Sequence, residues 1–229
     1  MPSRQPRSLD SMVEAQIRRW RAQEEARSRE AEPAPPAPLL TISRQYGSQG
    51  AAIGRSVADA LGLSFWDREL VHAIAVNSGI SEQLVASLDE HRRSKLEDFI
   101  DEILMGHQAT ERHYIAQLHR VLRTIGSHGG ALIVGRGAHF ALDDRAHLSV
   151  RVIAPEASRI SRIASQAGLP EGVVLPKVRE VEKERQAFVR TYFGRDVEDA
   201  NEYDLVLNSA RLGLELAAEI IIAAYRGRR

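Results

Sequence analysis

The apolar residues of the chain fall into short runs that alternate with longer stretches of helical spacing. The short runs predict five strands, at residues 39–42, 63–66, 131–134, 147–153 and 203–208. Apolar residues three and four positions apart predict helices at 53–61, 69–77, 156–166 and 212–225. Strands that alternate with helices form parallel sheets, so we expect an α/β fold with a five-stranded, doubly wound parallel sheet.

Two stretches interrupt this alternation. A helical pattern from residue 82 to 127 predicts a helical insertion of about residues 80–127, and Ser81 can cap a helix at its start, although without a full capping box. The stretch of about 168–198 carries many charges of both signs. It is either a solvated helix with ion pairs along its face or a lid whose arginines fold over phosphates.

Residues 1–38 differ from the rest of the chain and form an N-terminal arm. A helix is expected over residues 12–32, and prolines between 33 and 38 predict an extended linker to the domain at 39–229. The sparse apolar residues of this helix leave two alternatives. The arm is mobile, or Ile17 and Trp20 dock on a partner subunit, which would make a homodimer.

Composition excludes several classes of protein. The 229 residues carry 31 basic and 31 acidic side chains, so no net charge favours nucleic acid or an acidic membrane. There is no cysteine, which removes disulfides and thiolate metal sites. No apolar run is long enough to span a bilayer, and residues 1–10 lack an apolar secretory core. We therefore expect a cytoplasmic protein with no nucleic-acid or membrane partner.

The turn after the first strand contains Gly47 and Gly50 and leads into a helix. Small residues let backbone amides converge on an anion, and a helix N-terminus adds partial positive charge, so this layout suits phosphate. In the usual GxxxxGK[ST] pattern the lysine and the hydroxyl residue would fall on Gly50 and Ala51, and both groups are missing here. The alternative is an ordinary tight turn.

Charged residues follow two other predicted strands. Arg136 lies between two glycines after the strand at 131–134, where a guanidinium could meet a phosphate or simply face solvent. Asp67 ends the strand at 63–66 and could cap the next helix or face a ligand crevice. The histidines at 107, 113 and 119 do not share a helical face, so we interpret them as surface or interface residues and not as a metal site.

Five stretches in this order resemble the cytidylate kinase-like family, a branch of the P-loop nucleoside monophosphate kinases. They are residues 42–48, 66–70, 133–138, 190–196 and 203–209, and the resemblance covers about residues 39–226. It implies a three-layer P-loop NTPase-like fold with a helical insertion and a lid. It also implies phosphoryl transfer from ATP, with Mg²⁺, to a nucleoside monophosphate, CMP or dCMP by analogy.

The resemblance also assigns candidate site residues. The ATP site would comprise Arg44, Gly47, Ser48, Gln49, Gly50 and Arg55, with Arg44 or Arg55 replacing the missing lysine. The acceptor site would comprise Asp67, Arg68, Gly135 and Arg136. Catalytic cations would be Arg136, Arg162, Lys183, Arg185 and Arg190, with Arg159 beside the lid. Mg²⁺ would be held through the ATP phosphates, with Ser48 as a further ligand.

The chain departs from the family pattern at several of these positions. Gln49–Gly50–Ala51–Ala52 replaces the Gly-Gly-Arg-Glu often found in the turn, and Gly137 replaces an acceptor-side acid. Phe188, Phe193 and Val197 stand where Tyr, Thr and Trp are frequent. The alternative to a working kinase is therefore a catalytically impaired module of the same fold that senses nucleotide.

Overall fold

The computed structural model describes residues 8–28, 37–88, 93, 96, 100, 109–142 and 147–228. The end of the predicted N-terminal helix, most of the proline-rich linker and the middle of the predicted insertion, His107 included, lie outside the described residues. The chain divides into two compact units. One joins the residues before Pro38 to Glu69–Gly129, and the other comprises Pro38–Arg68 and Gly130–Arg229.

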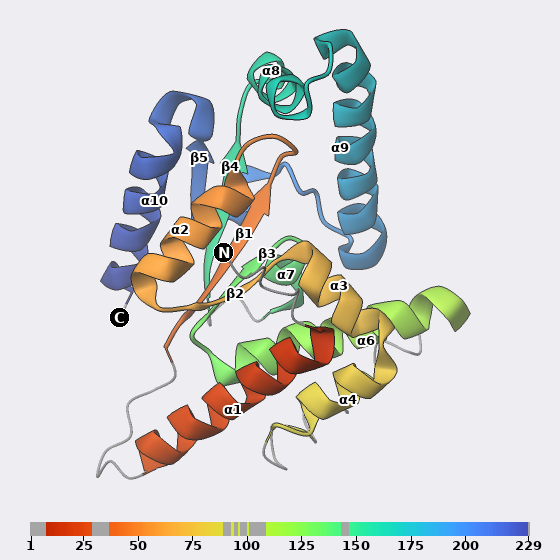
Figure 1. The fold of residues 1–229 in the computed structure, drawn as a ribbon. Coiled ribbons are helices and arrows are strands. Elements are labelled where there is room, and N and C mark those ends of the chain that lie inside the picture. The colour runs from red at the N-terminus through yellow and green to blue at the C-terminus, as the bar shows by residue number, and fades with distance from the viewer. Residues whose placement is uncertain are drawn as a thin grey trace, which may run out of the picture. The chain divides into compact units, whose positions relative to one another are not determined.

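The second unit is built on one parallel sheet of five strands, in the order β2-β3-β1-β4-β5 (Figure 1). The strands are β1 (Leu39–Arg44), β2 (Ser64–Trp66), β3 (Ala131–Val134), β4 (His147–Ile153) and β5 (Leu205–Asn208). In the central strand Leu40 pairs with Leu132 of β3 and Leu148 of β4. The α/β class and the five-stranded parallel sheet expected from the sequence are thereby confirmed.

Helices α2 (Gly50–Leu61) and α10 (Ser209–Gly227) pack on each other and on the sheet (Figure 1). The core between them contains Leu40 and Ile42 of β1, Ile53 of α2 and Ile221 of α10. Tyr225, fully buried near the end of α10, donates a hydrogen bond of 2.6 Å to the carbonyl oxygen of Pro38. The last helix is thus tied to the residue that precedes β1.

The remaining helices of this unit follow β3 and β4. They are α7 (Ala138–Ala141), α8 (Glu156–Ala167), α9 (Glu171–Phe193) and the short 3-10 helix η1 (Ala200–Glu202). Helices α8 and α9 pack through a small apolar cluster around Ile160 and Val178, which Tyr46 also contacts. The stretch predicted as a lid therefore contains one long helix that is fixed to α8.

The other unit is helical. It contains α1 (Leu9–Ser28), α4 (Ser78–Val85), α6 (Ala109–His128) and all but the first residue of α3 (Arg68–Val76). Trp20 is only 3% exposed, and its ring stacks on His128 with 3.9 Å between centroids. Docking of Trp20 on a partner subunit is therefore not what the structure shows, because the side chain packs within its own unit.

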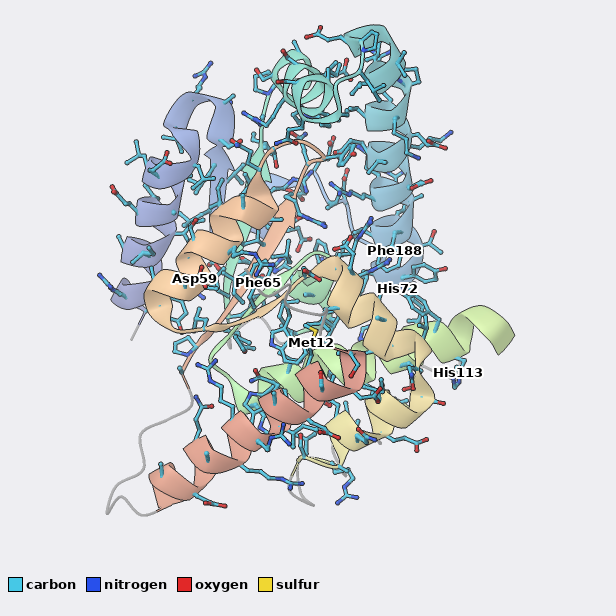
Figure 2. All side chains as sticks on the ribbon, in the orientation of Figure 1. Met12, Asp59, Phe65, His72, His113 and Phe188 are labelled. Carbon is cyan, nitrogen blue, oxygen red and sulfur yellow. The ribbon has the colours of Figure 1, made fainter. Side chains whose placement is uncertain are left out.

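Two further expectations about this unit are wrong. Ser81 does not cap a helix: Asn77 does, by accepting a hydrogen bond from Ile80 N, while the buried Ser81 hydroxyl donates to Gln117. His119 is not a surface residue but is buried in α6, whereas His113 of the same helix is exposed (Figure 2). No metal-binding cluster of acidic or histidine side chains occurs among the described residues, and no described helix has the length and apolarity to cross a membrane.

Candidate active site

Backbone hydrogen bonds fix the start of the turn between β1 and α2. Gln45 N donates to Val152 O of the neighbouring strand, and Ser48 N donates back to Gln45 O. A Cβ on Gly50 would lie 2.5 Å from Cβ of Arg44, so only glycine fits where the helix begins against the strand. Gln49, just before it, has a positive φ of 63°.

Side chains of α8 and α9 form hydrogen bonds with backbone groups of this turn. Arg159 and Arg162 donate to the carbonyl oxygens of Tyr46 and Gly47, respectively. The carboxylate of Glu182 accepts a hydrogen bond of 2.6 Å from Tyr46 N. A carboxylate oxygen on a backbone amide of the turn shows that the amide can bind an anionic oxygen, which is what a phosphate-binding turn requires.

Ser48 is enclosed within the turn. Its side chain has 0% exposure, its hydroxyl donates to Gln45 O at 2.9 Å, and its carbonyl oxygen accepts from Ser209. In this conformation the hydroxyl does not reach a ligand, so Ser48 does not present the Mg²⁺ ligand that the resemblance implies. Arg162 likewise holds the turn and does not line the cavity described next.

A cavity of about 200 Å³ lies in the second unit, beside β1, β3 and β4 and under α9. Five arginines from five different parts of the fold line it, together with Glu182 and Glu184. The formal charge of its lining is therefore positive by three units. The five arginines are Arg44, Arg68, Arg136, Arg151 and Arg185.

Arg136 reaches the cavity from the turn between β3 and α7. Its backbone has a φ of 54°, and apart from glycine only Gln49 shares a positive φ in the described part of the chain. Such strain concentrates at functional sites, and here both strained residues lie in turns that follow central strands. The Arg136 guanidinium also lies 5.8 Å from the ring centre of Phe188, which projects from α9 (Figure 2).

Arg185 joins the cavity to the turn. Its Nη1 donates to the carbonyl oxygen of Arg44 at 2.9 Å and lies 3.4 Å from the carboxylate of Glu182. Burial lowers the pKa of Arg185, Glu182 opposes that shift, and the nearby positive charges of Arg68 and Arg151 add to it. An arginine stays protonated in proteins, so an anion in the cavity would relieve this unfavourable charge.

The cavity gathers only some of the predicted site residues. Arg44, Arg68, Gly135, Arg136 and Arg185 line it. Gly47, Ser48, Gln49 and Gly50 form the adjacent turn, while Lys183 and Arg190 are exposed on α9 outside the cavity. Arg55 and Asp67 form an ion pair of 3.7 Å with each other, and Arg55 lies over the ring of Phe65.

Sequence reasoning missed three polar residues that line the cavity from the sheet itself: Thr41, Ser43 and Arg151. The signal was present, because each interrupts an otherwise apolar strand at alternate positions. It also missed Glu182, for which a helix rich in charges gives no distinguishing signal.

Comparison with known proteins identifies the fold and family. A profile of the cytidylate kinase-like family matches residues 39–211. The chain belongs to the cytidylate kinase-like family. It is similar to the cytidylate kinase of Aeropyrum pernix, with 26% identity over 189 residues that cover 82% of this chain and 98% of that protein. The cytidylate kinase of Desulfurococcus amylolyticus is 27% identical over 185 residues, or 80% and 89% of the two chains.

A solved structure shows the same fold. An uncharacterized protein from Eubacterium ventriosum superposes with a TM-score of 0.63 at 16% identity, covering 82% of this chain and 98% of the other. The family and its relatives support a kinase-type phosphotransferase that binds nucleotide.

The residues that depart from the cytidylate kinase-like pattern lie at or beside the cavity. Phe188 and Val197 line it, and the Phe193 ring packs against Gly137.

Proposed function

We propose that this protein transfers a phosphoryl group from ATP, with Mg²⁺, to a nucleoside monophosphate, with CMP and dCMP as the favoured acceptors. The observation that carries the proposal is the set of five arginines around one cavity, next to a glycine turn that leads into α2. Phosphoryl transfer needs little covalent help from the protein. It needs alignment and positive charge around the transferred group, and this arrangement offers both.

The two substrates would bind on either side of the end of β1. The backbone amides of Tyr46, Gly47, Gln49 and Gly50, at the N-terminus of α2, suit the phosphates of ATP. Arg44 would supply positive charge in place of the absent lysine. The cavity with Arg68 and Arg136 suits the acceptor. Arg185 contacts the end of β1 and lines the cavity, so it is placed to stabilise negative charge that develops between the two substrates.

The residues fit Mg²⁺ only as a partner of ATP. Among the described residues no acidic or histidine cluster could hold a metal ion, and Ser48 is enclosed. In the proposal Mg²⁺ is therefore bound through phosphate oxygens and water, where it offsets phosphate charge. Lys183 and Arg190, exposed on α9, would act only if α9 moved toward the bound nucleotide.

An acceptor-dependent kinase assay tests the proposal. Purified protein is incubated with Mg·ATP and each nucleoside monophosphate, and both ADP and the phosphorylated acceptor are measured. Arg136→Ala is expected to lower kcat/KM for the acceptor about 10- to 100-fold, because it removes charge-assisted hydrogen bonds to phosphate. Arg211→Ala, which changes an exposed arginine of α10, is the matched control. Equal losses in both variants, or no acceptor-dependent ADP in the wild type, would contradict the proposal.

A second candidate is a nucleotide sensor without turnover. The contact between Glu182 and Tyr46 N favours it, because a carboxylate already occupies an amide of the turn, and the turn lacks both the lysine and its common arginine substitute. Tight ATP binding without ADP formation in the same assay would select this function over the kinase.

A further inference from the structure

One face of the sheet carries polar side chains where a central parallel sheet usually carries apolar ones. In β1, Leu40 and Ile42 belong to the core cluster, so Thr41 and Ser43 face the other way. Arg151 of β4 pairs in register with Ser43, and all three polar residues line the cavity. We call Thr41, Ser43 and Arg151 the cavity floor, because Thr41 and Arg151 are far more buried than the arginines around it.

Arg151 is a buried charge whose guanidinium lies 5.7 Å from the ring centre of Tyr203, and its other described contacts are a neutral hydroxyl and one distant carboxylate. It is 4% exposed, and its Nη1 donates to the neutral hydroxyl of Ser43 at 2.8 Å. The carboxylate paired with it, that of Glu198, is half-exposed and 3.9 Å away. A buried guanidinium normally has a close, hydrogen-bonded anion, and the one described here is distant and solvated.

Thr41 gives an independent indication that a ligand binds in the cavity. Thr41 is only 1% exposed, and within the described residues its hydroxyl has no hydrogen-bond partner. A buried hydroxyl without a partner is unfavourable and rare, and the usual explanation is a missing ligand or water. Because Thr41 lines the cavity, a ligand there could satisfy it.

Arg185 adds a second guanidinium to the same space. Its side chain is largely buried, and its ion pair with Glu182 is long at 3.4 Å. The charges of Arg151 and Arg185 repel each other within the cavity, so each increases the need for an anion between them. A phosphate monoester, with two negative charges and several acceptor oxygens, meets the donors of both arginines and of the floor hydroxyls.

We propose that the cavity floor of Thr41, Ser43 and Arg151 is a binding subsite for a phosphate monoester group. This rests on the proposed function in one respect, namely that the group is the phosphate of the acceptor nucleotide. In that case Arg151 is a binding residue beyond the family motifs that contain Arg68 and Arg136, and the acceptor phosphate lies against the sheet itself.

Calorimetric titration with inorganic phosphate, CMP and cytidine tests the subsite. The key variant is Thr41→Val, which keeps the shape of the side chain and removes a hydroxyl that has no protein partner. It should fold with a thermal midpoint equal to or above that of the wild type and bind phosphate and CMP about 3- to 10-fold more weakly. Arg151→Lys, which keeps the charge but loses the planar fork, should weaken both more strongly.

Thr124→Val is the matched control, since Thr124 is also buried but its hydroxyl already donates to Arg120 O in α6. It should leave phosphate binding unchanged. Unchanged phosphate affinity in both Thr41→Val and Arg151→Lys would overturn the subsite, as would a wild type that binds cytidine as tightly as CMP. Phosphate binding that depends on Thr41 and Arg151 without kinase turnover would retain the subsite and reject the proposed function.

Discussion

The carboxylate of Glu182 accepts a 2.6 Å hydrogen bond from the backbone amide of Tyr46, although the two residues are 136 positions apart. Through this contact α9 places a negative charge on the turn that the proposal assigns to ATP. Any anion that uses the same amide must displace Glu182. The contact therefore couples the position of α9 to whether the turn holds phosphate.

We expect Glu182→Gln to bind ATP about 3- to 10-fold more tightly than the wild type, because a neutral amide competes less well for Tyr46 N and no longer repels phosphate. Equilibrium dialysis with labelled nucleotide measures this. Glu180→Gln is the control: Glu180 is exposed on α9 and pairs with Lys177. Weaker or unchanged ATP binding in Glu182→Gln would show that Glu182 supports the turn rather than competing with its ligand.

Gly137 is expected to be intolerant of any side chain. Its φ is +66°, and a Cβ would lie 2.1 Å from the Phe193 ring. Gly62 has nearly the same φ, +67°, but open space around its Cβ position, so Gly62→Ala measures backbone strain alone. Urea denaturation should show a loss of about 1 kcal/mol for Gly62→Ala and roughly 1–3 kcal/mol more for Gly137→Ala. If Gly62→Ala and Gly137→Ala lower the free energy of unfolding equally, the Phe193 ring moves aside without an energetic cost.

His119 predicts a pH dependence of stability. Burial, with a smaller effect of Arg123, lowers the pKa of His119 from 6.5 to about 4. Between these values the unfolded chain binds a proton that the folded chain does not, so stability falls as pH decreases from about 6.5 to 4 and this contribution levels off below. The full effect is on the order of 3 kcal/mol.

Denaturation curves for His119→Gln across this pH range check the expectation. In His119→Gln the free energy of unfolding should lose this dependence on pH. In His113→Gln, at an exposed position of the same helix, it should keep the dependence. If the free energy of unfolding of His119→Gln still falls with decreasing pH as in the wild type, the pH dependence comes from other groups.

Trp20→Ala is expected to lower the stability of the helical unit by about 3–5 kcal/mol, because it removes a buried aromatic side chain that stacks on His128. Met12→Ala, at an exposed position of α1, should cost little. Sedimentation should show the same oligomeric state for both variants as for the wild type. Dissociation of an oligomer by Trp20→Ala, with stability unchanged, would restore the interpretation of α1 as a docking arm.

The sequence predicted the sheet well because local patterns determine it. The bounds of β3 and β4 match the predicted runs, and α8 begins at Glu156 as Pro155 and the helical spacing indicate. The expectations that Ser81 caps a helix and that His119 lies at the surface were wrong, and the structure does not show the alternative in which Trp20 docks on a partner subunit. Ser81 contacts Gln117 and Trp20 contacts His128, both distant in sequence, and a single helical pattern reveals neither such contacts nor the burial of His119.

The site was predictable only in part. Arg136 could be selected because glycines flank it, and Arg185 because it matches a lid cation of the family; the structure brings both to the cavity. Arg151 was overlooked because a strand residue is assumed to serve packing, and its charge becomes informative only when burial is known. Arg162 was selected for catalysis, but it contacts a carbonyl oxygen of the turn, a role that depends on how α8 is placed.

The hydrogen bond from Tyr225 to Pro38 has a practical consequence for how this protein is shortened or joined to other sequences. Because the last turn of α10 is bonded to the residue that precedes β1, deleting the final five positions would remove this attachment of the central strand on which the cavity is built. Affinity tags and fusion partners therefore belong after Arg229, where they leave the hydrogen bond between Tyr225 and Pro38 intact.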